Sequence, residues 1–168
     1  DLIDLVAQLY KAGFIDESGH LESRQKKSNV FMLVPSEKSG NDRGVYLTQK
    51  DIGEVQLAKA AIAAGIHLLM KQLGITEKDI DRVYIAGAFG NYMNPESAAE
   101  IGMFPLSLLD KITPVGNAAG EGAKTALLNA QERKEMNQVV RNIEFVELAA
   151  SPEFQDCFVD ELCFPEME

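Results

Sequence analysis

The stretch that most constrains the fold of this chain is RVYIAGAFGNY at residues 82–92. Its first part, VYIA at residues 83–86, has the branched and aromatic side chains that favour a β-strand. The turn that follows contains Gly87 and Gly90, which let the backbone turn sharply and leave room for a ligand. Asn94 and Pro95 then fit the N-cap and first position of a helix. The stretch predicts a strand, a glycine-containing turn and a helix start.

This turn has two interpretations. Ligands of α/β proteins bind at the carboxyl ends of strands, which would place a ligand beside Gly87 and Gly90. The alternative is a tight strand-to-helix connection that binds nothing. The residues of the turn leave both interpretations open.

Composition limits the classes of function. The chain has 168 residues, enough for one domain with its own core, and we expect a single domain. A net charge of −10 argues against binding to nucleic acid or to an anionic membrane, because both need a basic patch. The uncharged runs are too short to span a bilayer, and the start of the sequence lacks the basic region of a signal peptide. We therefore expect a cytoplasmic protein.

Metal and disulfide chemistry is limited by the small number of ligands. Cys157 and Cys163 cannot complete a four-thiolate zinc or iron–sulfur site, so the alternative is a half-site shared with another chain. The only histidines are His20 and His67, and we expect no metal site made by this chain alone. Because the chain starts with Asp1 and a helical pattern, we expect a fragment or a processed chain that begins inside or just before a helix.

The remaining patterns predict alternating helices and strands. Helices are expected at residues 2–12, 49–73, 95–101, 117–128, 132–142 and from 151, and strands at residues 30–34, 45–47, 83–86, 111–115 and 143–148. The first two strands would form an antiparallel hairpin. The predicted fold class is α/β, with a mixed sheet of about five strands packed with helices.

The long helix at residues 49–73 carries a charge that its apolar pattern does not explain. Lys59 projects into the main apolar stripe, and Gln56 flanks it. Lys59 either extends its ammonium to the edge of the core or carries it across apolar surface to an anion or a nucleotide. The stripe consists of Ile52, Val55, Ile62, Ile66, Leu69 and Leu73.

A second glycine-rich turn, GNAAGEGAKTALL at residues 116–128, also leads into a helix. Its small side chains indicate either close backbone packing, onto the sheet or onto the ligand turn, or a phosphate site. Packing is favoured, because no Gly-Lys-Ser/Thr sequence follows and Glu121 would repel a phosphate.

Together these motifs resemble the C-terminal part of the reductive activators of corrinoid proteins. The matching segments are LTQKDIGEVQLAKAAIAAGI (47–66), DRVYIAGAFGNYMNPESA (81–98), PVGNAAGEGAKTALL (114–128), FVELA (145–149) and CFP (163–165). That family resembles actin, the sugar and acetate kinases and the heat-shock chaperones, in which two ribonuclease-H-like subdomains clamp ATP. The resemblance implies that this chain is the second half of such an actin-like ATPase clamp.

The resemblance also implies a set of site residues. The turn would be the adenosine motif, faced from the long helix by two side chains that reach ribose or base. The implied contacts are Gly87, Ala88, Phe89, Gly90 and Asn91 in the turn, and Gln56 and Lys59 on the helix. The implied cofactor is ATP or ADP, with Mg²⁺ supplied through the other half of the clamp.

Two parts of the family pattern are missing from this sequence. It has no Asp-x-Gly-Thr phosphate loop, and it lacks the four-cysteine ferredoxin-like part, so a 2Fe–2S cluster is expected in the parent protein only. The implied role of the parent is ATP-dependent restoration of cobalt(I) in a corrinoid protein, its partner. We expect no catalytic residue and no ATPase activity in this chain alone. The alternative is an interaction module that forms a homodimer or docks a corrinoid or methyltransferase partner.

Overall fold

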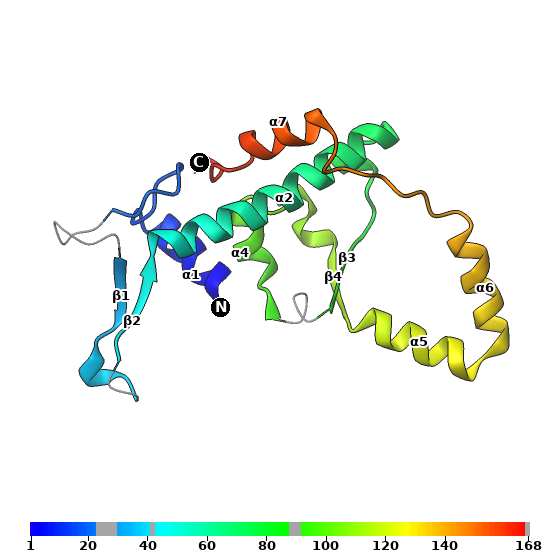
Figure 1. Cartoon of the computed structure of the whole chain (residues 1–168), viewed down its shortest axis with the longest axis horizontal. Helices are drawn as coiled ribbons and strands as arrows, with labels where there is room; N and C mark the ends of the chain where they lie inside the picture. The colour runs from blue at the N-terminus through cyan, green and yellow to red at the C-terminus, as the bar shows by residue number, and fades with distance from the viewer. Residues whose placement is uncertain (23–29, 41–42, 88–91, 167–168) are drawn as a thin grey trace.

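The computed structural model describes residues 1–22, 30–40, 43–87 and 92–166 (Figure 1). The elements in chain order are α1 (Leu2–Lys11), β1 (Val30–Val34), η1 (Ser36–Lys38), β2 (Val45–Thr48), α2 (Gln49–Leu73), η2 (Glu77–Asp79), β3 (Val83–Ala86), α4 (Pro95–Glu100), η3 (Leu106–Lys111), β4 (Ile112–Gly116), α5 (Ala118–Leu128), α6 (Ala130–Val140) and α7 (Pro152–Asp160). The predicted α/β class is confirmed.

Helix ends follow signals in the local sequence. At the start of α2, Thr48 Oγ1 accepts a hydrogen bond from the Asp51 N–H at 3.2 Å, and Asp51 accepts one from the Thr48 N–H at 2.8 Å. Gly74, in the left-handed conformation with φ +66°, ends the same helix. Asn94 accepts a hydrogen bond from the Glu96 N–H at 2.9 Å ahead of Pro95. The predicted limits of α2 and the start of α4 are therefore confirmed.

The sheet differs from the prediction. Within the described residues there are four strands in two separate sheets: β1 and β2 form the expected antiparallel hairpin, and β3 and β4 run parallel. The predicted fifth strand is wrong, because residues 143–148 form an irregular segment between α6 and α7. Phe145 in this segment is 82% exposed. Its alternating pattern is that of a strand, but this segment pairs with no described strand.

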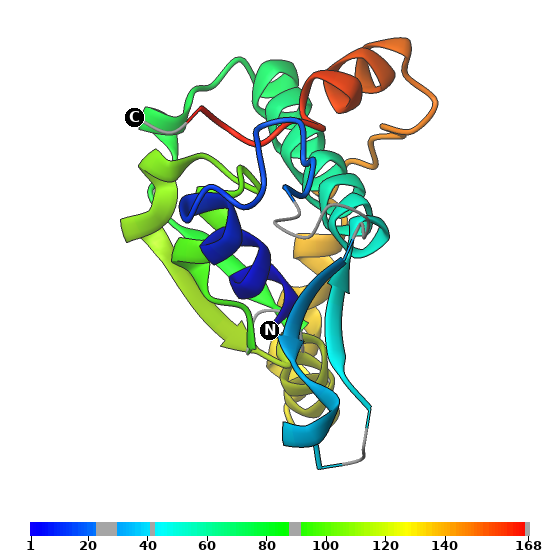
Figure 2. The ribbon, with the colours of Figure 1, turned by 90° about the vertical axis from the view of Figure 1, so that its left-hand side faces the viewer.

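Helix α2 is the axis of the molecule and packs against α1, β2 and α7 (Figures 1 and 2). The predicted stripe is only partly buried: Ile52 and Val55 lie in the core, whereas Leu73 is 70% exposed. The buried face turns instead toward the small residues, including Gly65, whose neighbour is the Leu148 side chain. By length and composition α2 could cross a membrane, and 44% of its most apolar 18-residue window is buried in the molecule.

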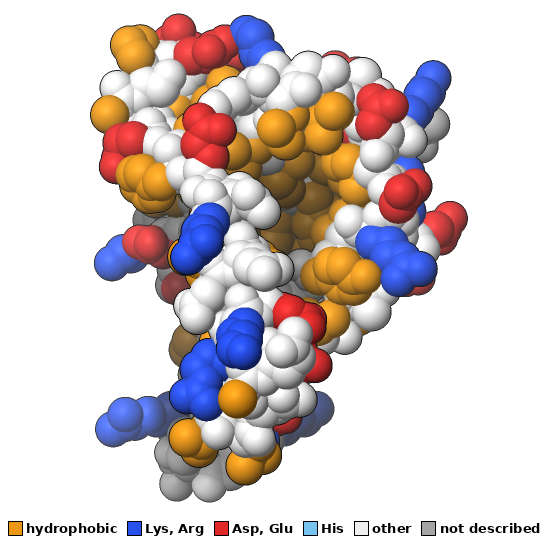
Figure 3. Space-filling view, turned by 90° about the vertical axis from the view of Figure 1, so that its right-hand side faces the viewer, with side chains coloured by type: hydrophobic (Ala, Val, Ile, Leu, Met, Phe, Trp, Pro, Cys, Tyr) orange, Lys and Arg blue, Asp and Glu red, His pale blue; other side chains and the backbone are white. Residues whose placement is uncertain are grey.

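Helices α5 and α6 form an arm that projects from the body (Figure 1). Neither helix has a buried residue, so the expected packing of the small α5 residues on the sheet does not occur. Val139 and Val140 of α6 are exposed. On the side that carries the arm, the surface has a hollow lined by hydrophobic side chains (Figure 3). Apolar side chains of the arm are therefore exposed to solvent.

Candidate functional site

Gly87, the first residue of the glycine turn, lies at the carboxyl edge of the parallel sheet. Gly87 follows β3 with φ +86°, a conformation that side chains disfavour, and a Cβ placed on it would meet no atom of the described residues within 4 Å. Open space at this position is what close approach of a ligand requires. The predicted contacts Ala88, Phe89, Gly90 and Asn91 lie outside the described residues.

The structure brings the second glycine turn to the same edge. Ala86 at the end of β3 is opposite Gly116 at the end of β4, and Gly116 also has a positive φ of +61°. Asn117 then caps α5 by accepting a hydrogen bond from the Gly120 N–H at 3.0 Å. The ends of β3 and β4, which Gly87 follows and Gly116 closes, are therefore adjacent, at the edge where α/β proteins bind ligands.

Lys59 and Gln56 hold the C-terminal end of the chain. We call residues 161–165 the C-terminal strap. The Lys59 side chain is 1% exposed, and its Nζ donates a hydrogen bond to the Cys163 carbonyl oxygen at 2.5 Å. Gln56 Nε2 donates to the carbonyl oxygens of Leu162 at 2.8 Å and Ser18 at 3.0 Å. Among the described residues, neither side chain donates a hydrogen bond to Gly87.

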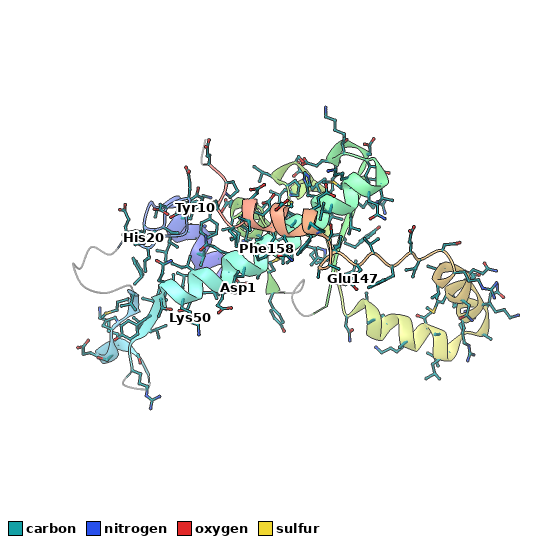
Figure 4. All side chains as sticks on the ribbon, turned by 45° about the horizontal axis from the view of Figure 1, so that its top comes forward. Asp1, Tyr10, His20, Lys50, Glu147 and Phe158 are labelled. Carbon is teal, nitrogen blue, oxygen red and sulfur yellow. The ribbon has the colours of Figure 1, made fainter. Side chains whose placement is uncertain are left out.

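Further contacts fix the strap in place. The Phe164 N–H donates to the Glu17 carbonyl oxygen at 2.8 Å, and the Phe164 ring is 3% exposed, with its centroid 5.1 Å from that of Tyr10. The Tyr10 hydroxyl, on the labelled α1 side chain in Figure 4, donates to the Pro165 carbonyl oxygen. A Cβ on Gly102 would lie 2.8 Å from Pro165 Cγ, so only glycine leaves room for the strap.

Two opposing effects act on the pKa of the Lys59 ammonium. Burial lowers the pKa of the Lys59 ammonium, while the charges of Glu161 and Cys163 act in the opposite direction. The Glu161 carboxylate lies 3.9 Å from Nζ, and the Phe164 ring centroid lies 5.9 Å away. Sequence reasoning identified Lys59 as misplaced in an apolar stripe but missed its strap partners, which lie more than a hundred residues later.

Metal ligands do not gather in the described part of the chain, where no group of three His, Cys, Asp or Glu side chains could hold an ion. Cys157 and Cys163 are free thiols. His67 is exposed on α2, as expected for a helix-face residue. The candidate site is therefore the carboxyl edge of the parallel sheet at Gly87 and Gly116, which we call the glycine edge. The contacts of α2 with the C-terminal strap are separate from it.

Comparisons with known proteins cover most or all of the chain. The family model of the C-terminal domain of RACo, the ASKHA domain, matches residues 1–168. The corrinoid activation enzyme RamQ of Eubacterium limosum is 32% identical over 94% of this chain, and the [Co(II) methylated amine-specific corrinoid protein] reductase of Methanosarcina barkeri is 27% identical over 80% of it.

A solved structure of a reductive activator for corrinoid, iron–sulfur protein superimposes on 99% of the chain with a TM-score of 0.86 and 34% identity. The chain spans less than a third of these proteins: 29% and 25% of the two curated relatives and 28% of the solved chain. The predicted actin-like fold is thus confirmed for the chain as a whole. The chain belongs to the family of the C-terminal ASKHA domain of RACo.

Proposed function

We propose that this chain is the C-terminal nucleotide-binding part of an ATP-dependent reductive activator, which restores cobalt(I) in a corrinoid protein for methyl transfer. The observation that carries the proposal is the likeness of this chain to a reductive activator for corrinoid, iron–sulfur protein, with a TM-score of 0.86 over 99% of its length. The activity, the corrinoid partner, the 2Fe–2S cluster and the Mg²⁺ ion belong to the complete protein in this proposal. The expected cytoplasmic location, and the absence of nucleic-acid and membrane partners, are part of it as well.

The residues of this chain fit a nucleoside best at the glycine edge. Gly87 offers open space at a backbone position with positive φ, and Gly116 lies beside the same strand ends. In the proposal the turn of Gly87, Ala88, Phe89, Gly90 and Asn91 lets the base and ribose approach the backbone closely. Bound ATP would stabilise the conformation of the complex that binds it more tightly, and so favour electron transfer.

Gln56 and Lys59 stay part of the proposed nucleotide site, but their contact with nucleotide depends on the strap. Their polar ends are engaged with the carbonyl oxygens of Leu162 and Cys163, so a direct contact with nucleotide requires the strap to give up these hydrogen bonds. We therefore expect Gln56 and Lys59 to contact the nucleotide only if the strap moves away from them.

Thermal unfolding with ATP, ADP and AMP tests nucleotide binding. A ligand that binds only the folded state raises the melting temperature, with about 2.7 kcal/mol of added stability at a concentration 100-fold above Kd. We expect all three nucleotides to raise it, because the adenosine part makes the proposed contacts, and we expect no ATP turnover by this chain alone. Melting curves that stay unchanged with all three nucleotides would contradict the proposal.

The alternative function is an interaction module that forms a dimer or docks a corrinoid or methyltransferase partner. The observation that favours it is the exposed apolar surface of the arm, where Leu128 is 85% exposed. Sedimentation measured over a range of protein concentrations separates the two functions. Self-association without any nucleotide-induced shift supports the module, whereas a shift in a protein that stays monomeric supports the nucleotide site.

A further inference from the structure

A cavity of about 590 Å³ lies apart from the glycine edge. It is bounded by α1, the second half of α2, the turn after α4 and the strap. Gln56, Lys59 and Gly87 are not among its lining residues. Its size falls within the range of about 300–1,000 Å³ that is usual for binding pockets.

The charges of this cavity select a cation. Four carboxylates line it, from Glu77, Glu100, Glu161 and Glu166, and among the described lining residues the only basic groups are Lys11 and His67. Lys11 is already engaged, since its Nζ lies 2.5 Å from Glu100 Oε1, and Glu161 faces the buried Lys59 ammonium at 3.9 Å, which leaves Glu77 and Glu166 without an ion pair among the described residues. An anion would be repelled, whereas an ammonium or guanidinium group would find several carboxylates within one pocket.

One carboxylate of the wall also has unmet acceptor capacity. Glu100 Oε1 binds Lys11, while Oε2 is buried and has no hydrogen-bond donor among the described residues. Buried polar atoms are usually paired, so an unpaired one calls for a partner. Glu77 has only the neutral Ser107 hydroxyl as a side-chain donor in the described part of the chain. These oxygens favour a ligand that brings donors with it.

The rest of the cavity is apolar and open to the surface. Ile66 and Met70 from α2 and Phe104 from the turn after α4 line it, and Leu106 at its edge remains 64% exposed. A pocket for a free small molecule normally encloses most of the ligand's surface. An edge as exposed as Leu106 is better suited to a side chain that a protein surface delivers, with neighbouring residues covering the edge.

We propose that this cavity docks a basic, amphipathic segment of a partner protein. A Lys or Arg side chain of the partner meets the carboxylates of Glu77 and Glu166, and apolar side chains next to it cover Met70 and Leu106. Charge complementarity identifies the occupant: the pocket is acidic in a chain of net charge −10, which attracts a basic partner from a distance. This site functions independently of nucleotide.

Fluorescence anisotropy with a short labelled peptide of Leu, Arg and Lys tests the proposal on the 168-residue chain. Two control peptides replace Leu by Ser or replace the basic residues by Glu. The pocket variant combines Glu77→Gln with Glu166→Gln, and the matched control combines Glu144→Gln with Glu147→Gln, which are exposed and outside the cavity. We expect the pocket variant to weaken the basic apolar peptide about tenfold, and the control variant to leave its affinity unchanged.

A further variant tests the apolar part. Leu106→Ser should weaken the Leu-containing peptide and leave the melting temperature unchanged, because the side chain is mostly exposed. The proposal would be overturned if both double variants weakened the binding of the basic apolar peptide equally, or if the Ser-containing peptide bound as tightly as the Leu-containing one. Either result would attribute binding to general surface charge. Full displacement of the peptide by phenethylammonium at equal concentration would overturn it in favour of a small-molecule site.

Discussion

Lys59, in the middle of α2, donates a hydrogen bond to the carbonyl oxygen of Cys163, 104 positions later in the sequence. Gln56, one turn earlier on the same helix, binds the carbonyl oxygen of Leu162. Two polar side chains on the longest helix therefore fix the C-terminal strap by its backbone. This relationship accounts for a buried charge that apolar periodicity cannot explain.

Removal of the Lys59 side chain should destabilise the fold. Lys59→Ala deletes a buried stem and leaves the Cys163 carbonyl oxygen without its donor, at a cost of about 2–4 kcal/mol in unfolding free energy. Lys59→Met keeps most of the stem and removes the cost of burying an ammonium, so we expect a smaller loss. Urea unfolding measures both, with the exposed Lys124→Ala as control. An unfolding free energy of Lys59→Ala within about 0.5 kcal/mol of wild type would contradict the role of the strap.

Phe164 should be the main apolar anchor of the strap. Its ring is buried against Tyr10, so Phe164→Ala should cost about 3–5 kcal/mol of unfolding free energy. Tyr10→Phe removes only the hydrogen bond to the Pro165 carbonyl oxygen and should cost about 0.5–1.5 kcal/mol. Phe145→Ala is the matched control, because that ring is exposed and should change stability little. Equal effects of the two Phe→Ala changes would argue against a packed strap.

Gly87→Ala should affect nucleotide binding separately from stability. Its φ of +86° strains any other residue by about 1–2 kcal/mol, and the added Cβ enters the open space proposed for the nucleoside. Gly74→Ala is the control: its φ is +66°, its Cβ would also meet nothing within 4 Å, and it lies at the end of α2. Both variants should lose similar stability, but only Gly87→Ala should reduce the ATP-induced rise in melting temperature. An unchanged rise in Gly87→Ala would place the nucleoside elsewhere.

The buried ammonium should give stability a recognisable dependence on pH. Burial holds the pKa of folded Lys59 below its ordinary value of 10.5, so the unfolded chain binds the proton more tightly than the folded chain does. Stability should therefore rise with pH between the lowered pKa and 10.5, relative to Lys59→Met. The pH dependence that Lys71 gives to stability has the opposite sign. Glu153 raises the pKa of Lys71, so the stability that this residue contributes is lost as pH rises through the raised pKa. Urea unfolding from pH 7 upward, compared among wild type, Lys59→Met and Lys71→Met, should show the two opposite trends.

The arm should open far more easily than the body. Helices α5 and α6 contain no buried residue, whereas α2 buries a continuous face, so the amides of the arm should exchange at opening free energies near zero. Hydrogen exchange with mass spectrometry compares peptides from α5 and α6 with those from α2. If the arm functions as an interaction surface, Leu127→Glu should leave stability unchanged and reduce self-association. Protection of α5 equal to that of α2 would contradict an unpacked arm.

Local rules in the sequence determined most elements. The Thr48–Asp51 capping box, the Asn94–Pro95 helix start and Gly74 are short-range signals, and each holds in the structure because its hydrogen bonds or backbone angles involve close neighbours. The β1–β2 hairpin and the family resemblance also came from sequence alone. The failures were long-range: periodicity could not reveal which face of α2 is buried, or that residues 143–148 would lack a strand to pair with.

Tertiary structure decided what the misplaced charge on α2 does. The sequence marked Lys59 as a polar residue in an apolar stripe and left its partner open. Only the fold brings the Cys163 carbonyl oxygen and the Phe164 ring to its ammonium, because these groups lie more than a hundred residues after Lys59 in the sequence. The same is true of the pairing of Ala86, the residue before Gly87, with Gly116, which a parallel strand register creates. Sequence specifies local backbone geometry, whereas contacts between distant residues depend on how the packed elements share the core.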